Sequence, residues 1–239
     1  MIDAGISGKK IEAGLKDIDV DPEKIDAIFI THEHTDHIAG VGVMARRYGI
    51  PIYSTVETIY AMLHTKKVGR ISEELLHYVK PDEKVTIKDI EITPFSISHD
   101  AANPVAYTFQ GDGQKIGIAT DLGTYDEYVV NHLQDSNLLL LEANHDVNML
   151  QVGSYPYMLK QRILGSKGHL SNMVSANLLC KLLHDKLQHV ILGHLSKDNN
   201  YPDLAYETVK CELEGNGYAC RDNFLSIAKC FEQTSVFEL

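Results

Sequence analysis

The sequence predicts an α/β fold in which two sheets pack face to face with helices on the outside. Short apolar or alternating strands come in two batches along the chain, and each batch is accompanied by segments of helical periodicity. Apolar strands repeatedly end in a histidine or an aspartate, and such ends can meet at one edge of a sandwich. The chain has 239 residues and no repeat or evident linker, so we expect one domain over residues 1–239.

The first batch of elements begins with a turn and a short helix. Asp21-Pro22-Glu23 is typical of a helix start and precedes a compact apolar strand. The helical spacing from Ile38 to Tyr48 ends where Gly49 is followed by Pro51. In order, we expect a helix at 11–15, a strand at 25–30, helices at 38–48 and 56–65 around a strand at 52–54, and a polar surface excursion at 66–84.

The second batch opens with period-two alternation, which is typical of half-buried strands. A hairpin is expected around Gln110-Gly111-Asp112-Gly113-Gln114, because Asp-Gly favours tight turns. Ser171 is a suitable N-cap for an amphipathic helix. In order, we expect strands at 85–87, 90–93, 95–98, 105–109 and 115–119, a helix at 125–133, a strand at 137–141, helices after Pro156 and at 171–183, a strand at 189–192, a helix at 202–213, and strands at 224–228 and 235–237.

Composition restricts the function. The formal net charge of -11, from 22 basic and 33 acidic residues, argues against broad electrostatic capture of nucleic acid, although local basic patches or bound cations can override it. The sequence shows neither a secretory signal pattern nor an apolar run long enough to cross a bilayer, so no membrane partner is expected. Four cysteines without Cys-x-x-Cys spacing favour reduced thiols, and we expect a cytoplasmic protein.

The strongest chemical signal is Ile-Phe-Ile-Thr-His-Glu-His-Thr-Asp-His at residues 28–37. His32, His34, Asp36 and His37 follow directly on an apolar strand, and imidazole with carboxylate suits zinc, manganese or iron. In an extended loop His32 and His34 project the same way and can bind one ion, while Asp36 and His37 are available to a second. The alternative is a set of solvated histidines on a surface loop.

Three later strand ends offer the remaining ligands. His99 is the best candidate to complete the first set, Asp121 can bridge two ions through its two oxygens, and His194 can close the second set. Two divalent ions held in this way share a hydroxide acidified to near neutral pH, which makes hydrolysis the natural reaction. Asp121 has one competing interpretation, as the N-cap of a following helix.

Three residues are predicted to take part in catalysis. Asp36 is expected to orient the hydroxide as well as to bind metal. Protonation of the leaving group needs another donor, for which His169 is the first candidate and His145 the second. Structural roles compete with both, because Gly168 and Ser171 around His169 can form a capped helix entry, and His145 can be a buried, hydrogen-bonded histidine.

The whole pattern resembles the metallo-β-lactamase superfamily, since His32-x-His34-x-Asp36-His37 is followed in order by His99, Asp121 and His194. The resemblance implies an αββα four-layer sandwich with two metals at one edge. It implies that the first metal is bound by His32, His34 and His99, that the second is bound by Asp36, His37 and His194, and that Asp121 bridges them.

Four short segments resemble the YycJ/WalJ-type (VicX-like) branch of that superfamily: residues 2–5, 143–146, 167–172 and 192–196. This resemblance implies a metal-dependent DNA exonuclease with two divalent cations, zinc or manganese, with iron as a further option. Members of the branch begin with a strand and a Ser/Gly-rich loop ahead of the Ile-Asp-Ala-Gly turn. We therefore expect the first N-terminal strands of the fold to be missing from this chain.

Two other functions stay open at this point. A thioester or lactone hydrolase of the same fold would use the same metal pair, with a small apolar pocket and no need for basic side chains near the metals. A non-enzymatic regulatory protein of a two-component signalling system would use the fold as a binding surface. Such regulators usually lose ligands, and the motif here retains all seven.

Overall fold

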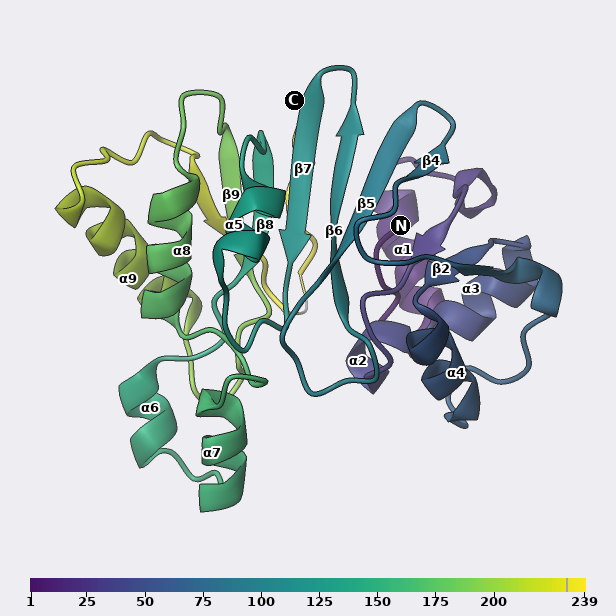
Figure 1. Ribbon diagram of the computed structural model, residues 1–239, viewed down its shortest axis with the longest axis horizontal. Helices are drawn as coiled ribbons and strands as arrows, with labels where there is room; N and C mark the ends of the chain where they lie inside the picture. Colours follow the sequence, from purple (N-terminus) through teal and green to yellow (C-terminus); the bar gives the residue numbers. More distant parts are fainter. Residues whose placement is uncertain (231) are drawn as a thin grey trace. The chain divides into compact units, whose positions relative to one another are not determined.

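Strands that alternate with helices account for most of the chain, as the sequence pattern predicts (Figure 1). The computed structural model describes residues 1–230 and 232–239, which fall into two units. The first unit comprises Met1–Ser96 and Ala101–Val105, and the second comprises Ile97–Asp100 and Ala106–Leu239.

A parallel three-stranded sheet forms the centre of the first unit. Its order is β1 (Ile28–Phe29), β2 (Ile52–Ser54) and β3 (Leu76–Tyr78), with Ile52 opposite both Ile28 and Leu76. All three strands are short, and Ile28 of β1 and Ile52 of β2 belong to a buried core that also includes side chains of the neighbouring helices. The unit also contains α1 (Gly8–Asp17), a 3₁₀ turn (Pro22–Lys24), α2 (Thr35–Ile38), α3 (Val41–Tyr48), α4 (Val56–His64), a second 3₁₀ turn (Glu73–Leu75), and the antiparallel pair β4 (Val85–Ile87) and β5 (Ile90–Ser96).

The first five residues brace the loop that follows β1. Ile2 pairs in parallel with Phe29, and the backbone N–H of Ala4 donates to the carbonyl of His37 at 2.8 Å. Gly5 packs directly on the backbone of this loop, because a Cβ there would lie 1.5 Å from the carbonyl oxygen of Asp36. Only glycine allows this approach, so the turn at 3–5 and the loop at 31–37 depend on each other.

Parallel strands also organise the second unit. The order is β10 (Leu225–Ile227), β9 (His189–Gly193), β8 (Leu138–Glu142), β7 (Gln114–Ala119) and β6 (Val105–Gly111), and only the β6–β7 pair among these is antiparallel. The helices of this unit are α5 (Glu127–Leu133), α6 (Val147–Val152), α7 (Tyr157–Leu164), α8 (Asn172–Leu182) and α9 (Pro202–Gly215).

Two local predictions for this unit are confirmed. Gly111 pairs with Gln114 across a two-residue turn in which Asp112 and Gly113 have φ values of +49° and +75°, as a type I′ hairpin requires. The hydroxyl of Ser171 accepts the backbone N–H of Val174 at 3.3 Å and caps α8.

Three details differ from the sequence prediction. The helix expected at 38–48 is two helices, because Gly40 lies so close to the first turn that a Cβ would be 2.3 Å from the carbonyl oxygen of Ile6. The surface excursion at 66–84 contains β3, which is fixed by its pairing with β2 rather than by a local apolar pattern. The strand predicted at 235–237 is wrong, since the structure describes these residues as irregular.

Candidate metal centre

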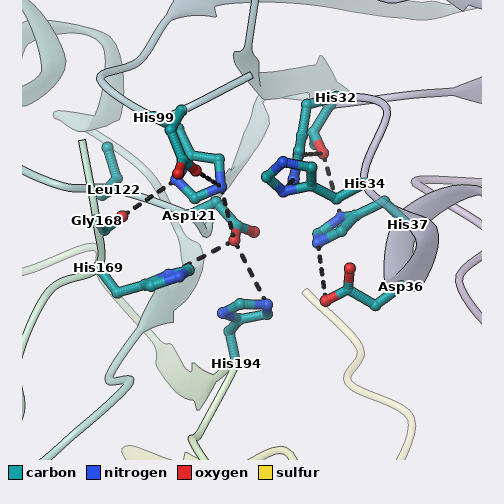
Figure 2. Close-up of polar contacts among 12 residues, drawn as sticks. His32, His34, Asp36, His37, His99, Asp121, Leu122, Gly168, His169 and His194 are labelled. Carbon is teal, nitrogen blue, oxygen red and sulfur yellow. Dashed lines mark hydrogen bonds and ion pairs between the residues drawn. The ribbon is translucent and has the colours of Figure 1, made fainter. Parts of the chain in front are cut away.

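The loop after β1 carries four of the predicted ligands and arranges them in two pairs. Nε2 of His32 lies 2.9 Å from Nδ1 of His34. Nε2 of His37 lies 3.8 Å from a carboxylate oxygen of Asp36, on the first turn of α2 (Figure 2). This division of the motif, two histidines together and an aspartate with a histidine, is the one that the sequence spacing predicts.

Asp3 and Thr31 orient two of these rings. The Asp3 carboxylate accepts the backbone N–H and the hydroxyl of Thr31, at 2.8 and 2.9 Å, and lies 2.7 Å from Nδ1 of His37. The Thr31 hydroxyl oxygen lies 3.0 Å from Nδ1 of His32. With both Nδ1 atoms donating to oxygen, Nε2 is the nitrogen of each ring that has a lone pair for a metal.

In the second unit the parallel register gathers polar residues at the carboxyl ends of adjacent strands. Ala119 of β7 pairs with Leu141 of β8, and Glu142 pairs with Gly193 of β9. Asp121 and His194 follow directly and both adopt the left-handed backbone region, with φ values of +59° and +56°. Such strained conformations cluster at functional sites, where surrounding contacts hold them.

Histidines surround the Asp121 carboxylate. Its Oδ1 lies 3.5 Å from Nε2 of His99, 3.5 Å from Nε2 of His194 and 3.6 Å from Nδ1 of His169 (Figure 2). His99 is oriented through its other nitrogen, because Nδ1 lies 3.1 Å from the carbonyl oxygen of Gly168. The structure thus brings three predicted metal ligands of this unit together with the predicted proton donor.

Glu142 is a candidate site residue that the sequence interpretation missed. Its side chain is fully buried; Oε1 lies 2.8 Å from Nδ1 of His169 and 2.9 Å from Nδ1 of His194, while Oε2 accepts the backbone N–H groups of Leu122 and Leu170 at 2.9 and 3.0 Å. Glu142 ends an apolar strand, as the predicted ligands do. The same signal would have identified it had it been applied to glutamate.

The charges of these groups favour cation binding. Burial lowers the pKa of His99, although the negative charge of Asp121 opposes the shift, so the ring is neutral at pH 7. Burial raises the pKa of Glu142, but the hydrogen bonds from His169 and His194 outweigh it and hold the pKa below its ordinary value. Neutral imidazole and ionised carboxylate are the forms that bind a metal.

The donor sets in each unit fit divalent ions. Nitrogen or oxygen ligands about 2.1 Å from an ion in tetrahedral arrangement lie about 3.4 Å from one another. The separations of 3.5 Å around Asp121 and 3.8 Å between Asp36 and His37 are close to this spacing. Donor atoms of Asp121, Glu142, His169 and His194 all lie within 4.8 Å of one another.

His145 is not part of this donor cluster. Its side chain is 1% exposed, and neither ring nitrogen has a hydrogen-bond partner among the residues that the structure describes. Burial lowers its pKa to about 4, with Glu142 opposing the shift. The prediction that His145 takes part in catalysis therefore has no contact in its favour and stays a prediction.

The sequence pattern described as "Beta-lactamase superfamily domain" matches residues 1–194, about four fifths of the chain. The chain belongs to the metallo-β-lactamase superfamily. A solved metallo-β-lactamase fold protein, YhfI from Bacillus subtilis, has 19% sequence identity and a TM-score of 0.67, over 95% of this chain and 83% of that one. The fold class predicted from the motif is confirmed at this level.

Two relatives within the superfamily are considerably more similar in sequence. Exodeoxyribonuclease WalJ of Streptococcus pneumoniae is 42% identical over 213 residues, which cover 89% of this chain and 79% of that relative. Exodeoxyribonuclease YycJ of Bacillus anthracis is 37% identical over 224 residues, which cover 94% of this chain and 84% of that relative. The branch resemblance predicted from four short segments is confirmed.

One further property concerns the helices. None in the described part of the chain combines the length and the apolar character that a membrane crossing requires.

Proposed function

We propose that this metallo-β-lactamase superfamily member is a dinuclear metal-dependent hydrolase that degrades DNA as an exonuclease. The proposal that DNA is the substrate rests on the 37–42% identity of this chain, over most of its length, to relatives named exodeoxyribonucleases. The donor sets in the two units support hydrolysis independently, because imidazole and carboxylate groups at this spacing suit divalent cations.

The proposed ligands are the seven residues of the superfamily pattern. Four of the histidine ligands are oriented through Nδ1, by Asp3, Thr31, Gly168 and Glu142. In each of these rings Nε2 is therefore the nitrogen that can bind a metal. Zinc and manganese are the proposed ions, with iron as a further option. The first ion is assigned to His32, His34 and His99, the second to Asp36, His37 and His194, and Asp121 is assigned to both.

Two bound divalent ions supply an acidic water near neutral pH and offset the negative charge of a phosphodiester. The chain's own residues orient the attacking water and protonate the leaving group. Asp36 is proposed to accept a hydrogen bond from the attacking water and to orient it. The restraint of the loop by Asp3 and Gly5 keeps this carboxylate in place.

His169 is proposed to protonate the sugar oxygen that leaves phosphorus. Its Nδ1 is engaged by Glu142, so Nε2 is the nitrogen that can deliver a proton. The side chain of His169 is 19% exposed, so a substrate can reach it. His145 is the second candidate for this role.

Two broader assignments accompany this proposal. We infer that the two units act as one domain, residues 1–239, because the superfamily pattern runs through both. The four cysteines are all free thiols, which suits the reducing cytoplasm.

A substrate panel tests the function. Purified protein with manganese is offered end-labelled single- and double-stranded DNA beside a phosphodiester model compound and a thioester. Progressive release of nucleotides from a DNA end is expected. Hydrolysis of the thioester alone would show that the chain is a thioester hydrolase of the same fold, and no hydrolysis of any substrate with metal bound would favour a regulatory protein.

A further inference from the structure

The stretch from residue 147 to residue 184, which includes His169, has an unusual charge pattern. The chain contains 33 acidic residues among 239, or about one in seven, yet residues 147–184 contain none. The same 38 positions include Lys160, Arg162, Lys167 and Lys181. A basic stretch of this length in an acidic chain marks one place where a polyanion is not repelled.

Most of the first half of this segment is the helix pair α6–α7. Figure 1 shows the two short helices projecting from the rest of the second unit, beyond the end of the sheet where β7 ends. Asp121 follows β7, so the helices lie toward the same end of the unit as the candidate metal centre. All eight residues of α7 are described, and none is buried.

Large apolar side chains are exposed on this pair. Val152 is 87% exposed, Met158 is 76% exposed and Tyr157 is 71% exposed. These are the most exposed large apolar side chains among the described residues, and all three belong to one helix pair. Exposed large apolar side chains that are concentrated in one short stretch of chain, residues 152–158, are typical of an interaction site.

The basic groups on the pair and just after it are available to an anion to different degrees. Lys167 is exposed and forms no ion pair with any residue that the structure describes. Arg162 is about half exposed and pairs with Asp100 through Nε. Two further acids near the pair are engaged locally, since Asp146 caps α6 and Asp198 accepts the hydroxyl of Tyr155 at 2.8 Å.

The pair is also fixed in position before any ligand arrives. Nζ of Lys160 donates to the carbonyls of Gln151 and Gly153, at 2.8 and 2.6 Å, and ties the start of α7 to the end of α6. A Cβ at Gly153 would lie 2.7 Å from Oδ1 of Asn199, so this link packs closely on the rest of the unit. A rigid surface loses little conformational entropy when a flexible strand binds to it.

We propose that this surface, the α6–α7 face, defined by Val152, Tyr157, Met158, Arg162 and Lys167, binds single-stranded DNA on its way to the metal centre. The inference rests on the proposed function, whose substrate it specifies further. Unpaired bases expose flat apolar faces that stack on aromatic and apolar side chains, whereas a duplex buries them. Lys167 and Arg162 then meet the phosphates between stacked bases.

The test measures binding without catalysis. Fluorescence anisotropy in EDTA follows a labelled oligothymidylate of about 20 nucleotides, longer than the site of a single-strand-binding fold. Tyr157→Ala combined with Met158→Ala is expected to weaken binding about tenfold, in line with the loss of stacking. Lys167→Gln is expected to lower the slope of log affinity against log salt by about 0.7, the contribution of one phosphate contact on a single strand.

Matched controls are Tyr60→Ala on α4, where the side chain is 66% exposed, and Lys10→Gln on α1. Both should bind as the wild type does. Unchanged affinity in the Tyr157/Met158 variant, or an equal loss in both controls, would overturn the inference. So would a variant that shifts a dimer to a monomer in sedimentation while its DNA affinity stays the same, because the face would then bind a second copy. Wild-type binding through this face without DNA cleavage in manganese would refute the exonuclease activity and leave the binding surface standing.

Discussion

Oε1 of Glu142 lies 2.8 Å from Nδ1 of His169, and the Glu142 side chain is completely buried from solvent. The same oxygen lies 2.9 Å from Nδ1 of His194. One carboxylate therefore orients both the proposed proton donor and a proposed metal ligand. Two backbone N–H groups on its other oxygen fix its position, so the three side chains form one rigid network.

Glu142→Gln is expected to lower kcat on DNA by about 10- to 100-fold, the usual cost of removing a partner that orients a ligand. The amide keeps the shape of the side chain but removes the negative charge beside Nδ1 of His169. Steady-state kinetics and metal analysis of the purified variant check this. Glu127→Gln, which removes an exposed ion pair with Lys181, is the control. A kcat equal to that of the wild type would show that the network has no part in the reaction.

His169→Asn is expected to lower kcat on DNA by about 100-fold or more, within the range for a general acid. A nitrophenyl phosphodiester needs no proton on its leaving group, so its hydrolysis should fall much less. The ratio of the two losses is the measurement. Equal losses on both substrates would mean that His169 holds structure or substrate instead of delivering a proton.

Asp3→Asn is expected to weaken metal binding by about 10- to 100-fold, because the carboxylate at 2.7 Å fixes the proton position and orientation of His37. Competition with a chromophoric chelator gives the dissociation constants. Asp17→Asn, at the exposed end of α1, should leave them unchanged. The idea fails if Asp3→Asn binds metal as tightly as that control.

The buried ring of His145 makes stability depend on pH. Its pKa is about 4 in the folded chain and about 6.5 when unfolded. The unfolded state therefore takes up a proton first as the pH falls. Unfolding free energy should decrease by about 2 kcal/mol between about pH 7.5 and about pH 5 relative to a chain without this group. Above the unfolded pKa both states are neutral and the group has no effect.

His145→Leu removes the titrating group and keeps an apolar side chain of similar size. Urea unfolding in EDTA, for both proteins across this pH range, isolates the contribution of His145 as the difference between the two profiles. Parallel profiles would show that the wild-type ring is protonated or solvated in the folded state.

The sequence predicted features whose causes are local. The strand at 52–54 has the predicted bounds, and the cap at Ser171 was correctly identified, because apolar runs and capping side chains act over a few residues. The pairing of His32 with His34 likewise follows from their spacing in one loop. The break between helices at Gly40 could not be predicted from local sequence, because it depends on the backbone of residues distant in sequence.

Glu142 shows the same limit within the candidate site. Its role comes from four donors on three segments, at Leu122, at the adjacent His169 and Leu170, and at His194. No spacing within the sequence relates the three segments to one another. The parallel register of β7, β8 and β9 brings Leu122 and His194 to Glu142, and register is a property of the folded sheet.

The central claim is that the seven-ligand set holds two cations on which DNA hydrolysis depends. Nucleotide release from end-labelled DNA, measured while manganese is titrated into metal-free protein, tests it most directly. Wild-type activity should be absent in chelator and should appear as metal is added, while His34→Ala and Asp121→Ala should stay inactive through the same titration. Full hydrolytic activity of either variant in metal-free buffer would contradict the claim.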